Sequence, residues 1–337
     1  MDRDDIIIKK VIIHILDSYM GMPVLSDKEL ECGPDLYEFF RAHLEKVTNS
    51  DDIKACRFEE DSVVPVMLEG FMPESFVDVS RAVAEELYRI MNANIDIPAA
   101  DLAVILFRYS EKDYLGLLKM NYKSSYTHFT VSDFGENTND IIMQKALLPS
   151  ESQRLSEAAV IDLETMDIQL LEKKYDINGT KVNYMSNLFL KCHAPLSQKA
   201  RLDIVAKAVE QVNNKYFDKE DIDRKMEVKK IIHNELEESG ALNVASVKEK
   251  IFKDNDEMKK DFEEKLEKYH LDESVEIRPQ NKQTVKKFER QHLKTDTGIE
   301  ITIPMDQYGN NENVEFFTNP DGTISVMIKN IGKLTSN

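Results

Sequence analysis

The hydrophobic periodicity of this 337-residue chain changes twice along its length. Before about residue 178, short β-branched and aromatic runs are mixed with turn sequences and helical stretches, as in a mixed or antiparallel sheet with helices. From Thr180 to about Leu271 apolar residues recur at the 3.6-residue period of helices, and toward the C-terminus they alternate as in strands. The pattern predicts an α+β protein in three parts: an N-terminal α+β domain (1–178), a helical region (179–274) and a small antiparallel β unit that includes a basic segment (275–337).

The N-terminal part contains strand and helix signals in a defined order. Helices are predicted over Pro34 to Val47 and Glu74 to Met91, because each has an apolar stripe and a proline near its start. The short connection Ser110-Glu111-Lys112-Asp113 predicts an antiparallel hairpin rather than a parallel crossover. The predicted strands are Ile6 to Leu16, Pro23 to Leu30, Asp101 to Tyr109, Tyr114 to Tyr122, Ala158 to Leu163 and Met166 to Leu171.

The middle part is expected to be helical and the end of the chain to form strands. Thr180 is expected to cap a helix that carries Met185 and Phe189 on its apolar face, and Ser239-Gly240 is expected to end a later helix. Further helices are predicted over Leu202 to Tyr216, Lys219 to Glu238, Ser246 to Phe252 and Asp256 to Tyr269. The predicted C-terminal strands are Gly298 to Ile303, Val314 to Thr318 and Thr323 to Lys329, with a turn at Asn319-Pro320-Asp321-Gly322.

The strongest local charge in the chain is opposite in sign to its total charge. With 44 Lys and Arg against 62 Asp and Glu, the net charge is −18, which argues against coating of nucleic acid through overall charge. Residues 278–294 nevertheless hold six cations and one acid, Glu289. A local cation cluster binds phosphates because binding releases their counterions. We expect phosphate contacts from Arg278, Lys282, Lys286, Lys287, Arg290 and Lys294.

The same charge pattern leaves a second interpretation open. The cations of residues 278–294 would then neutralise the acidic body of the same protein or of a neighbouring subunit. The two interpretations differ in whether the six side chains line an exposed face or fold against acidic neighbours.

Carboxylates suggest one catalytic alternative. Asp162 and Glu164 share a face of a predicted strand, and Glu172-Lys173-Lys174 follows, a combination that in nucleases holds Mg²⁺ and activates water. So short a spacing is expected by chance among 62 acids, and a solvated strand edge is the default interpretation. The seven His and three Cys form no metal-binding or nucleophile motif. We therefore expect no catalytic residues, no metal ligands and no cofactor.

The N-terminal residues and the cysteines bear on location. The first residues, Met1 to Asp5, lack the basic region of a signal peptide, and Lys9 and Lys10 interrupt the apolar stretch that follows. The chain has three cysteines, Cys32, Cys56 and Cys192, which are too few and too scattered for a disulfide framework. This cysteine content fits a reducing compartment. We expect a cytoplasmic protein that does not enter the membrane.

Three sequence segments of the chain resemble corresponding segments of a known protein family, and they occur in the same order and with similar spacing. They are Val11-Ile12-Ile13-His14-Ile15-Leu16-Asp17; the run from Lys181-Val182 through Phe189-Leu190 with Gln198-Lys199-Ala200; and Gly298-Ile299-Glu300-Ile301-Thr302-Ile303, Asn319-Pro320-Asp321-Gly322-Thr323 and Ile328-Lys329-Asn330-Ile331-Gly332-Lys333-Leu334. Over essentially its whole length the chain resembles the bacterial 37-kilodalton nucleoid-associated protein family. The resemblance implies a cytoplasmic protein of the nucleoid that binds DNA without an established enzymatic activity, and it supplies no catalytic or DNA-contacting residues.

The residues and the resemblance together define the expected function. We expect a non-enzymatic nucleoid-associated protein that binds double-stranded DNA with low sequence specificity, as a homodimer in which two weak basic patches act together. In the alternative, the acidic N-terminal part is the working surface: residues 1–198 carry 20 basic and 34 acidic side chains, which suits docking on a basic DNA-handling protein such as a topology enzyme, or mimicry of DNA. A metal-dependent nuclease is the third candidate.

Overall fold

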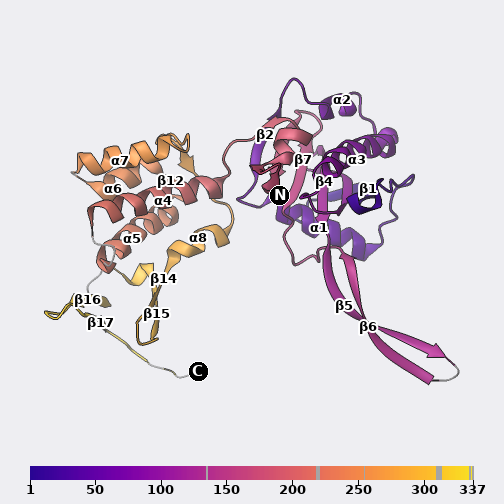
Figure 1. The fold of residues 1–337 in the computed structure, drawn as a ribbon. Coiled ribbons are helices and arrows are strands. Elements are labelled where there is room, and N and C mark those ends of the chain that lie inside the picture. The colour runs from indigo at the N-terminus through magenta and orange to yellow at the C-terminus, as the bar shows by residue number, and fades with distance from the viewer. Residues whose placement is uncertain (134–135, 218–220, 254, 309–312, 334, 336–337) are drawn as a thin grey trace. The chain divides into compact units, whose positions relative to one another are not determined.

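The chain folds into two compact units, Met1–Leu196 and Ser197–Asn337 (Figure 1). The computed structural model describes all residues except 134–135, 218–220, 254, 309–312, 334 and 336–337. Helices and antiparallel strands occur in both units, so the predicted α+β class is confirmed. The finer division predicted above, with boundaries after residues 178 and 274, stays a prediction.

The first unit is built on one antiparallel sheet. The predicted hairpin is confirmed, since Ala100–Tyr109 and Lys112–Asn121 pair along their whole length. Its connection is shorter than predicted: Ser110 and Glu111 alone turn the chain, with φ of 47° and 66°, as in the tight turns that match strand twist. The sheet order is β1 (Ile7–Leu16), β3 (Ala100–Tyr109), β4 (Lys112–Asn121), β7 (Glu157–Asp162), β8 (Asp167–Leu171), β2 (Lys54–Phe58) and β11 (Cys192–His193).

Helices cover both faces of this sheet. Leu102, Val104 and Leu106 of β3 point to one face, and the residues between them point to the other, because side chains alternate along a strand. Burial on both faces explains the nearly continuous apolar run of β3. The helical elements are α1 (Pro34–Thr48) on one face, and α2 (Val64–Leu68), α3 (Phe76–Ala93) and the π-helix η3 (Met185–Phe189) on the other; short 3-10 turns are η1 (Ser18–Met20) and η2 (Pro73–Ser75).

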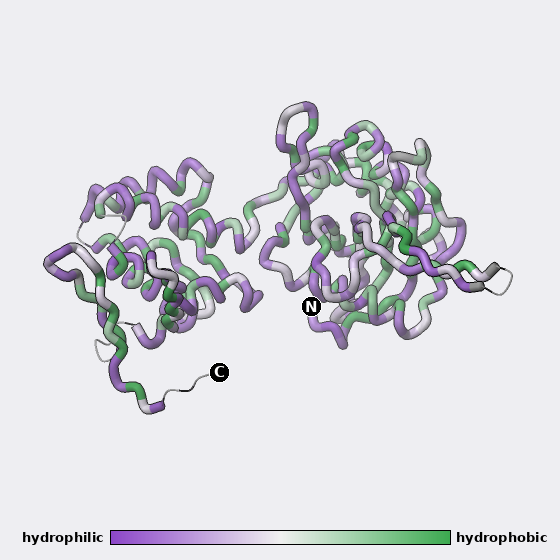
Figure 2. The backbone as a smooth tube through the Cα atoms, turned by 60° about the horizontal axis from the view of Figure 1, so that its bottom comes forward, coloured by the Kyte–Doolittle hydropathy of each residue, from purple (hydrophilic) through white to green (hydrophobic). Residues whose placement is uncertain are grey.

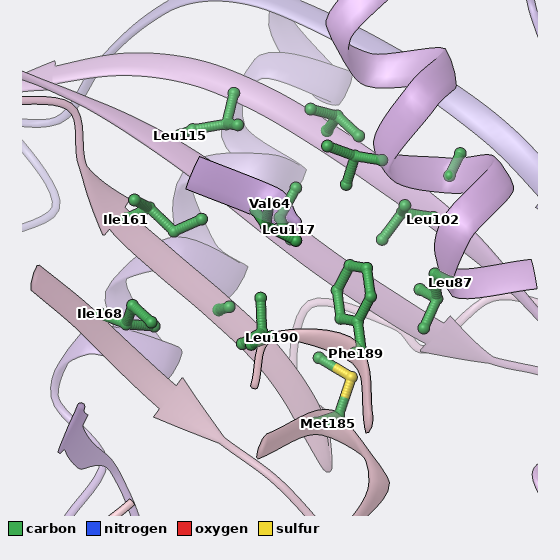
Figure 3. Packing of buried hydrophobic residues seen from close by; sticks show 14 of the residues in the cluster. Val64, Leu87, Leu102, Leu115, Leu117, Ile161, Ile168, Met185, Phe189 and Leu190 are labelled. Carbon is green, nitrogen blue, oxygen red and sulfur yellow. The ribbon is translucent and has the colours of Figure 1, made fainter. Parts of the chain in front are cut away.

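Figure 3 shows the core on the α3 face. Leu87 of α3, Val64 of α2 and Phe189 of η3 gather over Leu115 and Leu117 of the sheet. The predicted helices over Pro34 to Val47 and Glu74 to Met91 are confirmed as α1 and α3, and their apolar stripes are the faces that pack on the strands.

Two sequence predictions in this unit are wrong. No strand forms over Pro23 to Leu30; the segment makes one isolated bridge, from Ile15 to Val24. Thr180 does not cap a helix. It begins β10 (Thr180–Val182), which pairs with β9 (Tyr175–Ile177) across Asn178-Gly179, where both residues have positive φ. Asn-Gly favours this tight hairpin turn, and the local turn geometry prevails over the helical spacing that follows.

A long hairpin was not predicted. It consists of β5 (Lys123–Asp133) and β6 (Glu136–Leu147), and Figure 1 shows it projecting from the sheet of its unit. Its side chains are mostly exposed, including Tyr126, Phe129 and Ile141. Because polar and apolar residues occur on both faces, the segment lacks the alternation by which a strand is predicted.

The second unit joins helices to two small hairpins and one short pair of strands that are distant in the sequence. Side chains of Ser197, Asp221, Asn243 and Asn255 each accept a backbone N–H at a helix start, and Gly240, with φ of 66°, ends α5 as predicted. The helices are α4 (Gln198–Tyr216), α5 (Ile222–Ser239), α6 (Val244–Phe252), α7 (Asp256–Glu267), α8 (Lys282–Glu289) and the short η4 (Met305–Gln307). The strand pairs are β12 (Leu242–Asn243) with β13 (Glu276–Ile277), β14 (Arg290–Lys294) with β15 (Glu300–Pro304), and β16 (Val314–Thr318) with β17 (Ile324–Ile328).

The predicted helices and strands of this unit are largely confirmed, with one addition. The segment predicted to be a β unit contains a helix, α8, after the short strand β13. The expected start of one helix at Lys219 lies outside the described residues. Figure 2 shows hydrophobic and hydrophilic residues alternating along the helices, as expected of amphipathic helices. Among the described helices, none has the length and apolarity that a bilayer crossing requires.

A buried ionic network joins the strands of the first unit. The side chains of Lys119 (β4) and Glu157 (β7) are fully buried, and their charged atoms lie 3.3 Å apart. The Glu157 carboxylate also accepts hydrogen bonds from Asn121 and Tyr175, both at 2.7 Å, and from Tyr184. Burial lowers the pKa of Lys119 from its usual range, and the Glu157 carboxylate opposes this change.

We predict that Glu157→Ala destabilises the first unit by about 3–5 kcal/mol, because it leaves the Lys119 ammonium buried without its carboxylate. Urea dependence of amide hydrogen exchange in β4 and β7 measures the change. Glu164→Ala is the control, since that carboxylate is exposed and lies 3.8 Å from the Lys112 ammonium. Equal, small effects of the two substitutions would contradict a stabilising role for the network.

Candidate nucleic-acid interface

The basic segment folds as a short helix followed directly by a strand. The Asn281 side chain accepts a hydrogen bond from the Gln283 N–H at 2.9 Å and so begins α8. Lys282 and Lys286 are exposed one turn apart, Lys287 is exposed beside Phe288, and Phe288 itself is only 6% exposed. The α8 helix is therefore amphipathic, with lysines on its outer face and one aromatic anchor on its inner face.

The strand that follows, β14, also has charged side chains exposed and an apolar side chain turned toward the protein. Arg290 and Lys294 of β14 are exposed, and Leu293 between them packs against a small core with Met226 and Ile303. The Lys229 ammonium of α5 donates hydrogen bonds to the Arg290 carbonyl at 2.7 Å and to Gln291 Oε1 at 3.0 Å. Apolar packing and this lysine thus hold β14 against α5.

Three of the six predicted contact residues are ion-paired with acids of the same unit. Arg278 lies 2.7 Å from a Glu276 carboxylate oxygen, and Lys294 lies 3.0 Å from one of Glu300. Lys287 pairs with Asp203 of α4. For these three cations the neutralising interpretation fits the geometry, although exposed pairs of this kind are weak.

The other three cations have no such partner. Lys282, Lys286 and Arg290 are exposed and form no ion pair with any residue that the structure describes. Lys282 and Lys286 are separated by one helical turn, and Arg290 follows at the start of β14. Within the part of the chain that the structure describes, three of the six cations are thus ion-paired and three are not.

A cavity of about 400 Å³ lies behind α8, on the side opposite the unpaired lysines. It is bounded by α4, α5, α8 and β14, with Phe217 and Phe288 among its aromatic and Lys225, Lys229 and Lys287 among its charged lining residues. Burial lowers the pKa of Lys229, and the neighbouring Lys287 charge lowers it further. Sequence reasoning missed Lys229, because a lysine within a mixed-charge helix has no pattern that marks it.

The carboxylates proposed for metal binding do not come together. Asp162 Oδ1 accepts hydrogen bonds from the N–H groups of Glu164 at 2.9 Å and Thr165 at 3.1 Å, which fixes the β7–β8 turn. Glu172, beyond the other end of β8, is buried and paired with Lys54 at 2.7 Å. Over the described residues, no group of three or more His, Cys, Asp and Glu side chains is arranged to hold a metal ion. The described residues therefore do not form the grouping considered for the third candidate, a metal-dependent nuclease.

Comparison with known proteins places the chain in a family. The family model described as nucleoid-associated protein YejK matches residues 12–334. The chain belongs to this nucleoid-associated family. No curated protein matches the chain. The resemblance stated from three sequence segments is confirmed, and membership of the family supports a nucleoid-associated role.

We predict that Phe288→Ala releases α8 from the second unit. An eight-residue helix is marginal in water, and Phe288 is its one buried residue in the described structure. Loss of a buried Phe costs about 3–5 kcal/mol. Hydrogen exchange of α8 amides is expected to accelerate strongly while exchange in the first unit stays unchanged. Unchanged protection of α8, or the same acceleration in Val285→Ala, would contradict the anchoring role.

Proposed function

We propose that this nucleoid-associated protein binds double-stranded DNA without catalysing a reaction, through the outer face of α8 and the start of β14. Lys282, Lys286 and Arg290 contact phosphates, and Arg278, Lys287 and Lys294 contribute at the margin after exchanging their internal acids for phosphates. The observation that carries the proposal is that three exposed cations remain without an ion pair among the described residues, in a chain with a net charge of −18.

The chemistry of this surface accounts for weak, sequence-tolerant binding. Lysines act on phosphates as point charges and carry no base information by themselves. Among the exposed α8 residues, Gln283 is the one amide side chain with which a base edge could be read. A patch of this size is expected to bind with the micromolar or weaker affinity typical of non-specific contacts.

A homodimer would strengthen such binding. Two linked patches bind one duplex with an effective concentration set by their separation, so that overall affinity can exceed that of one patch by about 10²–10⁴. The proposed dimer therefore reconciles a small basic surface on an acidic chain with association with the nucleoid.

We predict that Lys282→Glu/Lys286→Glu weakens binding to a random duplex of about 30 base pairs and lowers the log–log salt slope by about 2, since each lost phosphate contact removes about one unit. Fluorescence anisotropy across a salt series measures both quantities. The matched control is Lys260→Glu/Lys268→Glu, which reverses two exposed lysines at α7 and changes the net charge equally. Equal losses in both variants would show a general charge effect and contradict the patch.

A second candidate function uses the acidic first unit. Residues 59–78 contain six acids and no Lys or Arg, and they include exposed apolar side chains, Val66 at 69% and Met72 at 63%. An acidic surface with apolar groups at its centre complements a basic protein surface with an apolar pocket. The partner proposed here is a DNA-handling protein, such as a topology enzyme, bound in place of or beside DNA.

We predict that the nuclease-treated full chain retains such an enzyme from an extract, as identified by mass spectrometry. Glu60→Gln/Glu69→Gln/Glu74→Gln is expected to lose it, because the substitutions remove charge and keep side-chain shape. Lys282→Glu/Lys286→Glu is the control and is expected to retain it. Retention by the acid-substituted variant would contradict docking through this surface.

A further inference from the structure

The cavity behind α8 has the size and the lining of a small-ligand site. Its volume of about 400 Å³ falls within the usual range of ligand pockets, about 300–1,000 Å³. All of its lining residues belong to the second unit, and they come from α4, the start and body of α5, the end of α8 and β14. The α8 helix therefore has the unpaired lysines on its outer side and closes this cavity with its inner side.

The lining of the cavity carries charges of both signs, and two of its cations pair with acids outside it: Arg224 with Glu227 and Lys287 with Asp203. The lining contains four cations and two acids, Glu210 and Asp221. The Arg224 guanidinium is fully engaged, since it bonds Asn213, Glu227 and the carbonyl of Ile251.

The lysines of the cavity differ from Arg224. Lys229 donates to two uncharged oxygens and forms no ion pair with a described carboxylate. Lys225 is exposed and has no hydrogen bond or ion pair through its side chain with a described residue. Lys225 and Lys229 are therefore the two cations of the described lining that are available to an anion.

The uncharged lining suits a planar ring with polar edges. Phe217 is 40% exposed, and the Arg224 guanidinium lies 4.9 Å from its ring centre. Phe288 of α8 also lines the cavity, and the Lys287 ammonium lies 4.9 Å from its ring centre. The amide of Asn214 makes no hydrogen bond with a described residue and is free to pair with a ring edge.

We infer that this cavity accepts one unpaired nucleotide of a DNA strand, with the base against Phe217 and Phe288 and the phosphate at Lys225 and Lys229. The inference rests on the proposed function, because the DNA whose phosphates contact the outer side of α8 would also supply the nucleotide that binds on its inner side. Base–aromatic stacking combined with cations that follow the backbone is the general mode of single-strand binding. The site thus favours DNA with unpaired bases over an intact duplex.

The test compares two aromatic residues of matched exposure. Phe217→Ala removes the cavity ring, and Phe317→Ala, 42% exposed on β16, is the control. Anisotropy is measured for the full chain with a labelled single strand of about ten nucleotides and with an intact duplex. We expect Phe217→Ala to weaken single-strand binding at least about fivefold and to change duplex binding less than about twofold. Phe317→Ala is expected to change neither.

Other outcomes separate the two proposals. Unchanged single-strand binding in both Phe217→Ala and Lys225→Glu, with circular dichroism showing intact folds, would overturn the cavity and leave the duplex patch standing. Selective loss in Phe217→Ala together with full duplex binding by Lys282→Glu/Lys286→Glu would overturn the patch and support the cavity. Displacement of the single strand by deoxyadenosine monophosphate, with no preference for the strand over the free nucleotide, would overturn the assignment to a DNA strand.

Discussion

Charge compensation within an acidic chain determines which cations remain free for a partner. In a chain with 62 acids and 44 cations, some surface cations pair with a carboxylate, as Lys287 does with Asp203 and Lys294 with Glu300. Lys282, Lys286 and Arg290 find none among the described residues. Since counterion release depends on local rather than total charge, these three residues support the proposed phosphate-binding surface, although the net charge of the chain is −18.

The position of this surface depends on packing behind it. Phe288 fixes α8 from within, and Leu293 and the Lys229 hydrogen bonds fix β14, so the cations are presented from a supported element and not from a loop. The same helix borders the cavity. Both proposed sites therefore lie on one amphipathic helix: the phosphate contacts on its outer side and the nucleotide site on its inner side.

The sequence predicted those parts of the fold in which burial of one face makes apolar residues recur at a regular spacing. The β3–β4 hairpin and the α1 and α3 helices followed from their apolar patterns. The exposed β5–β6 hairpin has no buried face and left no such pattern, and α8 has one buried residue in eight. For the site, charge clustering identified the segment, but the paired cations could not be recognised, because Asp203 is distant from Lys287 in the sequence and meets it only in the folded second unit.

Protection of individual lysines by DNA tests the central claim most directly. Limited acylation followed by mass spectrometry, with and without a random duplex of about 30 base pairs, reports the accessibility of each lysine in the unmodified sequence. We predict that DNA protects Lys282 and Lys286 and leaves Lys260 and Lys268 of the same unit as reactive as before. Protection of all four lysines alike, or of none at concentrations where DNA is bound, would contradict the assignment of α8 as the DNA-binding surface.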